Sequence, residues 1–181
     1  MKEQRILIVS DTHGSNNVVA KLIDKIKPNL TVCAGDSDND QKFIKKYFDY
    51  FALGDNEITK LPKFKKMVKG DFWEKKIYEE FFNQAQYFKF GNKNFMLTHY
   101  YSVKNPIKTL QKKYKQAIKD KKIDYIISGH THVPYITNLY YGYTIMNPGS
   151  IHKPRDVDAG KTYILGIYKN NKINFKICKV S

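Results

Sequence analysis

Five short polar motifs, each placed directly after an apolar run, constrain the fold of this chain more than any other feature. They contain four of its five histidines, and they are Asp11-Thr12-His13-Gly14, Gly35-Asp36, Gly54-Asp55-Asn56-Glu57, Thr98-His99 and Gly129-His130-Thr131-His132. Side chains that follow the strands of a parallel sheet collect at one edge of it. Carboxylates and imidazoles suit divalent transition metals better than Ca²⁺. The pattern therefore predicts a metal site at one rim of a strand-rich core, where two cations would activate a water beside a phosphate.

The first third of the chain alternates apolar runs with amphipathic segments. The apolar runs predict strands, and the segments between them predict helices, of which the first carries its apolar residues on one face and ends at Pro28. This alternation is typical of a parallel α/β sheet. Asp11, Asp36 and Asp55 would each lie at or just past the end of a strand. The predicted strands are 5–10, 30–34 and 50–53, and the predicted helices are 17–27 and 41–47.

The rest of the chain predicts a second, more antiparallel set of strands. Gly91-Asn92 separates two strand-like runs and indicates a hairpin. Residues 58–86 are rich in lysine and aromatic residues and predict a mixture of helix and loop. The predicted strands are 87–90, 94–98, 124–128, 135–139, 143–146, 162–168 and 172–180, and residues 106–122 form an amphipathic helix. Two sheets packed face to face, with helices outside, would accommodate both parts of the chain.

Length and composition favour one domain, residues 1–181, with a sizeable core. No stretch approaches the roughly 20 apolar residues of a membrane span, and the first apolar run is too short for a signal peptide, so we expect a cytoplasmic protein without membrane contact. Cys33 and Cys178 lie in apolar, strand-like runs, and neither has a second cysteine or a histidine at ligand spacing. We expect two buried, reduced thiols.

A formal net charge of +15 is compatible with a nucleic-acid partner, but the kind of basic residue weakens that interpretation. Arginine, the better bidentate ligand for phosphates and bases, occurs only at Arg5 and Arg155. The many lysines are better explained as solvated faces that attract anionic substrates. Nucleic acid is therefore an unfavoured partner, and a small or nucleotide-like phosphodiester is the favoured substrate.

The ordered set of motifs resembles the signature of the calcineurin-like metallophosphoesterase superfamily, which reads Asp-x-His, Gly-Asp, Gly-Asn-x-Asp/Glu, His and Gly-His-x-His. Asn147-Pro148-Gly149-Ser150 and the run 128–134 extend the resemblance to the small bacterial and archaeal phosphodiesterase family named after the YfcE protein. The resemblance covers Ile6 to Arg155. It implies an α/β fold, specifically a four-layer α/β/β/α sandwich of two packed mixed sheets with flanking helices.

The resemblance also implies a dinuclear centre. One metal would take Asp11, His13, Asp36 and His132, and the second would take Asp36, Asp55, His99 and His130. Asp36 would bridge the two ions together with a water or hydroxide, which would attack a phosphodiester in line. The metals are expected to be Mn²⁺, with Ni²⁺, Zn²⁺, Fe²⁺ or Co²⁺ as alternatives. The expected catalytic set is Asp36, Asp55, Asn56 and His99, and the residues expected near the substrate phosphate are Asn147, Ser150, Arg155 and His152.

This chain departs from the family pattern at three places. Asp55 stands where the family has an asparagine ligand, so either Asp55 or Asn56 would ligate the second metal. Asn56 occupies the position of a histidine that many superfamily phosphatases use as a general acid, which leaves His152 as a candidate proton donor or as a plain surface residue. Tyr100 and Tyr101 replace a glycine, and they would narrow the site, stack on the leaving group or simply pack.

Two other functions share the same motifs. The fold also serves as an interaction scaffold in the eukaryotic retromer subunit that resembles this family, and a catalytically weak metal-binding scaffold is one alternative. A nuclease that acts on long nucleic acid, suggested by the lysine excess, is the other. The sequence does not identify the oligomeric state, and a homo-oligomer is compatible with it.

Overall fold

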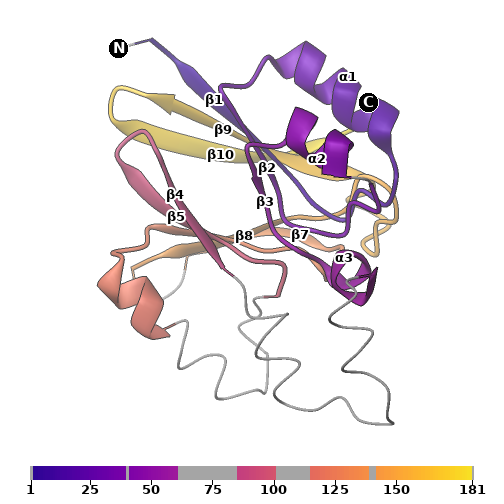
Figure 1. The fold of residues 1–181 in the computed structure, drawn as a ribbon. Coiled ribbons are helices and arrows are strands. Elements are labelled where there is room, and N and C mark those ends of the chain that lie inside the picture. Colours follow the sequence, from indigo (N-terminus) through magenta and orange to yellow (C-terminus); the bar gives the residue numbers. More distant parts are fainter. Residues whose placement is uncertain (1, 40, 61–84, 101–114, 139–141, 181) are drawn as a thin grey trace, which may run out of the picture.

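The computed structural model describes residues 2–39, 41–60, 85–100, 115–138 and 142–180. Its strands form two mixed sheets of five strands each (Figure 1). In the first sheet the order is β10-β9-β1-β2-β3, and in the second it is β4-β5-β6-β8-β7. The predicted combination of two packed mixed sheets in an α/β fold is therefore confirmed.

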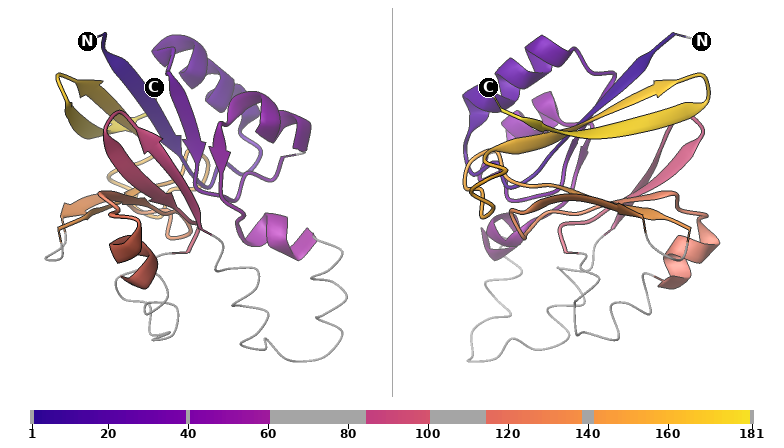
Figure 2. Two further views of the ribbon diagram at one scale, coloured as in Figure 1. Left: turned by 60° about the vertical axis from the view of Figure 1, so that its left-hand side comes forward. Right: turned by 180° about the vertical axis from the view of Figure 1, so that it is seen from behind.

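The first sheet combines a parallel and an antiparallel half. Strand β1 pairs in parallel with β2, which pairs in parallel with β3, whereas β9 and β10 are antiparallel to their neighbours. Helices α1 and α2 cover the outer face of this sheet (Figure 2). The elements are β1 (Gln4–Val9), α1 (Asn16–Ile26), β2 (Leu30–Cys33), α2 (Gln41–Tyr47), β3 (Tyr50–Phe51), β9 (Thr162–Lys169) and β10 (Lys172–Lys179).

The second sheet has a parallel centre and antiparallel edges. Strands β5, β6 and β8 are parallel, and β4 and β7 pair antiparallel at the two edges. The second half of the chain is more antiparallel, as predicted, in the pairs β4–β5, β7–β8 and β9–β10, whereas β5, β6 and β8 pair in parallel. A helical segment at 115–120 lies between β5 and β6 in the chain and covers the outer face of this sheet. The strands are β4 (Gln86–Phe90), β5 (Lys93–Leu97), β6 (Tyr125–Ile127), β7 (Pro134–Asn138) and β8 (Thr144–Pro148).

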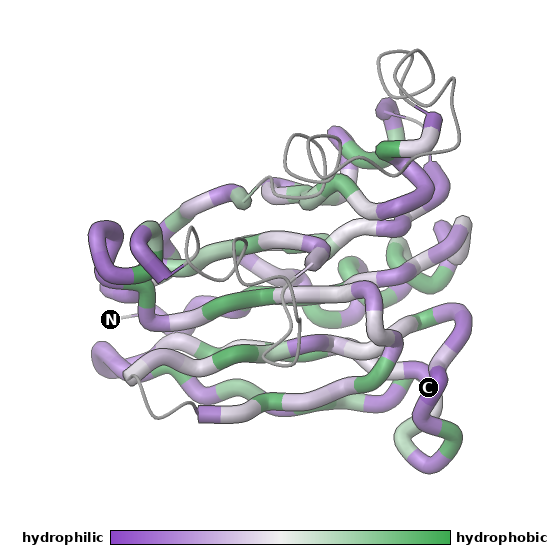
Figure 3. Tube along the Cα trace, turned by 90° about the horizontal axis from the view of Figure 1, so that it is seen from below, coloured by the Kyte–Doolittle hydropathy of each residue, from purple (hydrophilic) through white to green (hydrophobic). Residues whose placement is uncertain are grey.

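Alternation along the strands explains the four layers. Ile6 and Ile8 are fully buried between the two sheets, whereas Leu7 and Val9 pack with α1 on the other face. On β5, Phe95 and Leu97 face the first sheet in the same way, and Met96 belongs to the cluster under residues 115–120. Because both faces of the central strands are covered, their sequences are continuously apolar. The hydrophobic stretches accordingly lie within the strands, and the turns are hydrophilic (Figure 3).

Most predicted boundaries agree with the structure to within a few residues. The exception is α3 (Asp55–Lys60), a short helix that starts inside the third polar motif and was not predicted. Part of the predicted helix at 106–122 and nearly all of the segment at 58–86 lie outside the described residues. In the part of the chain that the structure describes, the helices are all too short or too polar to traverse a lipid bilayer.

Phe95 offers a direct test of the packing between the sheets. Its ring is fully buried, and it stacks against Phe88 at 5.0 Å and against Tyr125 at 4.9 Å between ring centroids. We expect Phe95→Ala to lower the free energy of unfolding by about 3–5 kcal/mol, measured by urea denaturation, because it leaves a cavity where three rings meet. Val157→Ala, at a side chain that is 88% exposed, is the control and should change it by less than about 0.5 kcal/mol. Equal stability of the two variants would contradict this packing.

Candidate metal centre

The candidate ligands lie on loops that follow the carboxyl ends of five strands. Asp11 and His13 follow β1, Asp36 follows β2, and Asp55 begins α3 just after β3. The second sheet supplies the others, because His99 follows β5 and the Gly129–His132 motif follows β6. Both sheets therefore contribute side chains to one rim, as the parallel strand directions require.

At this rim the carboxylates and imidazoles gather into three overlapping groups. Within each group, one potential ligand atom from every residue lies within 4.8 Å of the others. The first and second groups share no residue, and the third, which contains Asp36, takes one residue from each of them. The groups are Asp11, His13 and His132; Asp55, His99 and His130; and Asp11, Asp36 and His99. Asp36 thus lies between two groups of side chains that could each hold a divalent cation.

Glycines in three of the motifs allow the loops to approach so closely. A Cβ atom at Gly54 would collide with the side chain and backbone nitrogen of Asp36. One at Gly129 would collide with the Ser10 hydroxyl and lie 2.7 Å from the Ala34 carbonyl oxygen, and one at Gly35 would lie 2.6 Å from His99 Nδ1. The glycines in Gly-Asp and Gly-His are therefore required by contacts between loops.

The ligand loops adopt an unusual backbone conformation. Of the ten non-glycine residues with positive φ in the described ranges, six lie on these loops: Asp11, His13, Asp36, Asp38, His130 and His132. Such residues cost on the order of 1–3 kcal/mol each and persist only where their surroundings hold them. Hydrogen bonds between loops do so here, for example from Asp11 N to Gly35 O at 2.9 Å and from His13 N to Asp36 O at 3.1 Å.

The Glu57 carboxylate holds the loop after β2 in place by hydrogen bonds, a role that the sequence did not predict. Its carboxylate accepts four backbone N–H groups at 2.9–3.0 Å, from Asp36, Ser37, Asp38 and Gly54. The negative charge strengthens each of these bonds. The only signal in the sequence was its position within the third polar motif.

Three of the candidate histidines have their Nδ1 atom engaged by a protein oxygen. His99 Nδ1 lies 2.5 Å from the Ala34 carbonyl oxygen, and His132 Nδ1 lies 2.6 Å from that of Lys153. His13 Nδ1 pairs with Asp38 Oδ2 at 2.9 Å. When Nδ1 carries the proton and donates it, Nε2 is left with its lone pair free for a metal. Asp38, which also accepts from Lys60, is a second residue that sequence reasoning missed.

Unpartnered buried atoms supply the strongest test of whether a cation fits. Asp55 Oδ1 and His99 Nε2 are buried and lack a hydrogen-bond partner, and Asp11 Oδ1, which is also buried, lies 3.1 Å from His132 Nε2. Leaving such atoms unpaired is unfavourable, and a cation bound between Asp55 and His99 would satisfy both of the unpaired atoms. The side chains of Asp36 and His99 are also almost completely buried. The residues therefore fit divalent cations in both charge and donor type.

Electrostatics within the centre keeps Asp11 ionised. Burial acts to raise its pKa, but the hydrogen bond from His132, the charge of His99 and the Ser10 hydroxyl together hold the pKa of Asp11 below its usual value. The partner responds in the opposite sense, since the Asp11 carboxylate raises the pKa of His132 despite its partial burial. The two groups lie 3.1 Å apart, from His132 Nε2 to Asp11 Oδ1.

The structure distinguishes Asp55 from Asn56. Asp55 Oδ2 lies 3.3 Å from His130 Nδ1, within the group that contains His99. The Asn56 side chain donates instead to Asp38 Oδ2 at 3.1 Å, and its backbone N–H donates to Asp36 Oδ1 at 3.0 Å. Asp55 thus lies with His99 and His130, whereas the Asn56 side chain lies beside Asp38 and 3.3 Å from Nδ1 of His13.

The residues expected near phosphate occupy different settings. Asn147 and Ser150 are fully buried and hydrogen-bonded to the protein, Asn147 to the Gly129 carbonyl and Ser150 to the Asp11 carbonyl, so in this conformation they position the loops. The Arg155 side chain is exposed, and its backbone N–H donates to His132 O. His152 lies beside His13, with 6.0 Å between ring centroids.

Tyr100 lies against the second group of candidate ligands. Its ring centroid is 4.9 Å from that of His99 and 4.5 Å from that of His130. Tyr100 therefore flanks that group, a position from which it could narrow the site. Tyr101 lies outside the described residues.

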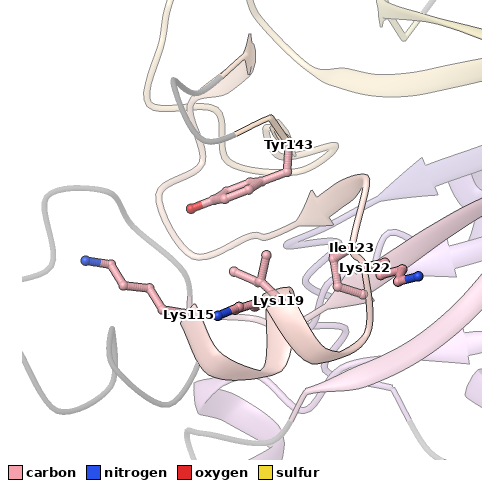
Figure 4. Close-up of a pocket in the computed structure, with 6 residues that line it drawn as sticks. Lys115, Lys119, Lys122, Ile123 and Tyr143 are labelled. Carbon is pink, nitrogen blue, oxygen red and sulfur yellow. The ribbon is translucent and has the colours of Figure 1, made fainter.

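A separate cavity of about 430 Å³ lies on the outer face of the second sheet (Figure 4). Tyr143 lies across from Lys119 there, and Figure 4 shows lysine side chains around it. The lining residues are Lys115, Ile118, Lys119, Lys122, Ile123 and Tyr143. None of these residues belongs to the polar motifs, so this cavity is separate from the candidate metal centre.

Glu57→Gln tests how strongly the carboxylate fastens the ligand loops. The amide keeps the size of the side chain but removes its charge and one acceptor oxygen, so we expect the free energy of unfolding to fall by about 1–3 kcal/mol in chelator-treated protein. Urea denaturation measures this change. Glu3→Gln is the matched control, because the half-exposed Glu3 carboxylate pairs with Arg5 near the surface, where such a pair contributes at most about 1 kcal/mol. Equal effects of the two substitutions would show that Glu57 does not fasten the loop.

Metal addition tests the fit of the centre directly. Because a cation that binds only the folded chain stabilises it by mass action, free Mn²⁺ at about 100 times its dissociation constant should raise the free energy of unfolding by about 2.7 kcal/mol. Urea denaturation with and without Mn²⁺ measures the shift. Asp36→Asn should weaken or abolish it, and identical unfolding of the unaltered protein in both conditions would exclude the site.

Comparison with known proteins agrees with this geometry. The model of the calcineurin-like phosphoesterase superfamily domain matches residues 4–171. A probable metallophosphoesterase of Mycoplasma genitalium is 24% identical over 172 residues, which cover 93% of this chain and 90% of the relative.

Solved structures of the same fold are similar along almost the whole chain. A predicted phosphoesterase from Streptococcus pneumoniae matches with a TM-score of 0.68 and 18% identity, covering 99% of this chain and 91% of its own. The E. coli phosphoesterase YfcE matches with a TM-score of 0.55 and 15% identity, covering 98% and 100%. Vacuolar protein sorting 29 from Cryptosporidium parvum matches with a TM-score of 0.59 and 16% identity, covering 97% of each chain. With a family model that spans nearly all of it and loops that gather the expected residue types, the chain belongs to the calcineurin-like phosphoesterase superfamily.

Proposed function

We propose that this protein is a phosphodiesterase that uses two divalent cations to hydrolyse a small or nucleotide-like phosphodiester. The observation that carries the proposal is the pair of ligand groups, Asp11-His13-His132 and Asp55-His99-His130, joined through Asp36. Phosphoesters carry negative charge, and the net charge of +15 favours their approach.

The proposed ligand sets follow from the neighbours of each side chain. His13, His99 and His132 would each bind through Nε2, because a protein oxygen engages Nδ1 in all three. Asp36 would serve both ions. The sets are Asp11, His13, Asp36 and His132 for one cation, and Asp36, Asp55, His99 and His130 for the other.

Two cations bound there would acidify a water molecule and neutralise charge on the phosphoryl oxygens. The protein's own part is to hold the ligand atoms in place, through the loop contacts at the glycines and the Glu57 carboxylate. The mixture of carboxylate and imidazole donors favours Mn²⁺, with Ni²⁺, Zn²⁺, Fe²⁺ and Co²⁺ as alternatives. A third carboxylate, Asp55, adds negative charge that would tighten binding of the cations and reduce their acidity.

The substrate preference follows from Asn56. Its side chain is an amide without an acidic proton, and it is committed to Asp38. A leaving group would therefore depart without help from this position. We propose that the preferred esters have leaving groups that are stable as anions, and that Tyr100 lines the site beside His99 and His130.

Hydrolysis of bis(p-nitrophenyl) phosphate tests the proposed reaction. Chelator-treated protein should be inactive and should regain turnover on addition of Mn²⁺ or Ni²⁺. Asp36→Asn should lower kcat/KM by more than about 100-fold, because removal of a shared ligand should exceed the 10- to 100-fold effects that residues behind the ligands produce. Asp24→Asn, the same substitution at an exposed position of α1, is the matched control and should retain activity. Equal activity of the two variants would contradict the proposed mechanism.

A binding scaffold is the second candidate function. It is favoured by the similarity in fold to vacuolar protein sorting 29. Binding of metal without turnover of any tested ester would support the scaffold over the enzyme. A nuclease is less well supported, and a turnover rate on long nucleic acid that does not depend on salt would count against it.

We propose a reducing, cytoplasmic location. Cys33 is buried and Cys178 is half-buried, and both are free thiols. Free thiols in a chain with two cysteines accord with a reducing compartment. Self-association remains compatible with the proposal and is not required by it.

A further inference from the structure

Ser15 stands at the N-cap position of α1 but does not cap the helix. A serine there commonly accepts a hydrogen bond from the backbone of the first turn, and Ser15 makes no such bond. Its hydroxyl oxygen lies instead 2.9 Å from Nδ1 of His152, which is 137 residues away in the chain. A residue well suited to stabilising the helix is thus used to hold an imidazole.

The backbone of His152 is also fixed to the candidate centre. Its N–H donates to Ser150 Oγ at 3.1 Å, and that hydroxyl donates to the carbonyl oxygen of Asp11 at 2.7 Å. Ser150 is fully buried. The loop that carries His152 is therefore linked to the first ligand motif. His152 is held through its backbone N–H by Ser150 and through its ring atom Nδ1 by Ser15.

This arrangement places the ring of His152 beside the candidate ligand His13. Its centroid is 6.0 Å from that of His13, whose own centroid is 5.2 Å from that of His132. His152 belongs to none of the three ligand groups. Among the described residues, its Nε2 atom makes no hydrogen bond that would compete with a ligand, and the side chain is only partly buried. The ring is accessible at the edge of the centre without being one of its ligands.

We propose that His152 contacts the substrate, and that its Nε2–H group donates a hydrogen bond to a non-bridging phosphoryl oxygen of an ester bound on the His13 side. Ser15 is the positioning residue: its hydroxyl donates to Nδ1, so that the proton of the neutral ring resides on Nε2. This deepens the proposed function and rests on it. His152 would thus supply a hydrogen-bond donor from a different loop, whereas the amide of Asn56 donates to Asp38.

The tautomer of His152 can be measured without metal or substrate. Long-range ¹H–¹⁵N NMR of the metal-free full chain at pH 8 should show the Nε2–H form in the unaltered protein and in Ser15→Thr, which keeps the hydroxyl. Ser15→Ala should show a mixture of tautomers. Asn17→Ala, at an exposed residue of the same helix turn, is the control and should leave the signal unchanged. An Nδ1–H form in the unaltered protein would overturn the assignment.

Kinetics with bis(p-nitrophenyl) phosphate then tests the contact. His152→Ala should lower kcat/KM between about 10- and 100-fold, the range expected for a lost hydrogen bond to a charged group. His152→Gln, whose amide can reach the position of Nε2, should restore part of the loss. The affinity for Mn²⁺, measured by calorimetry, should not change in either variant. Circular dichroism should show that both remain folded.

The outcomes separate this inference from the proposed function. Loss of activity in Asp36→Asn together with full activity in His152→Ala would overturn the role of His152 and leave the phosphodiesterase in place. Loss of Mn²⁺ affinity in His152→Ala would overturn it as well, since the residue would then serve the metals. An unaltered protein without turnover on any metal would overturn both.

Discussion

The close approach of loops from two different sheets is the constraint on which the rest of this structure depends. At Gly35, Gly54 and Gly129 there is no room for a Cβ atom, because each faces another ligand loop or its backbone. The Glu57 carboxylate gathers four N–H groups from two of these loops. If these loops stood farther apart, the same aspartates and histidines would be separate polar residues at the ends of strands.

The conformation at this rim is unfavourable by local criteria. Six of the residues on these loops have positive φ, and the buried atoms Asp55 Oδ1 and His99 Nε2 lack a hydrogen-bond partner. Strained backbone and unpaired buried groups both lower stability, and in natural proteins they concentrate at functional sites. The layered core compensates for them, since both faces of the central strands are covered by apolar side chains. A well-packed core thus supports a polar rim whose carboxylates and imidazoles could hold a cation.

This chain departs from the family pattern at Asp55 and Asn56, and it also places His152 beside the candidate centre. Asp55 makes the centre more negative than an asparagine would, and Asn56 connects to Asp38 rather than offering a proton donor. His152 reaches the same region from a loop near the end of the chain, held by Ser15. In our proposal, His152 on the loop after β8, rather than Asn56 at α3, supplies the hydrogen-bond donor to the substrate. These differences leave the candidate metal ligands in place.

The sequence by itself determined most strands and helices along the chain, the types of candidate ligand and, through its ordered motifs, the family, because apolar periodicity and residue chemistry are local properties. It did not reveal α3, the parallel centre of the second sheet, or the roles of Glu57 and Asp38. Only the tertiary structure decided which side chains share a group, that Asp55 rather than Asn56 faces His130, and that Ser15 binds His152. The physical reason is distance along the chain: His13 and His132 are 119 residues apart, and Ser15 and His152 are 137 apart, so their contacts depend on how the two sheets pack.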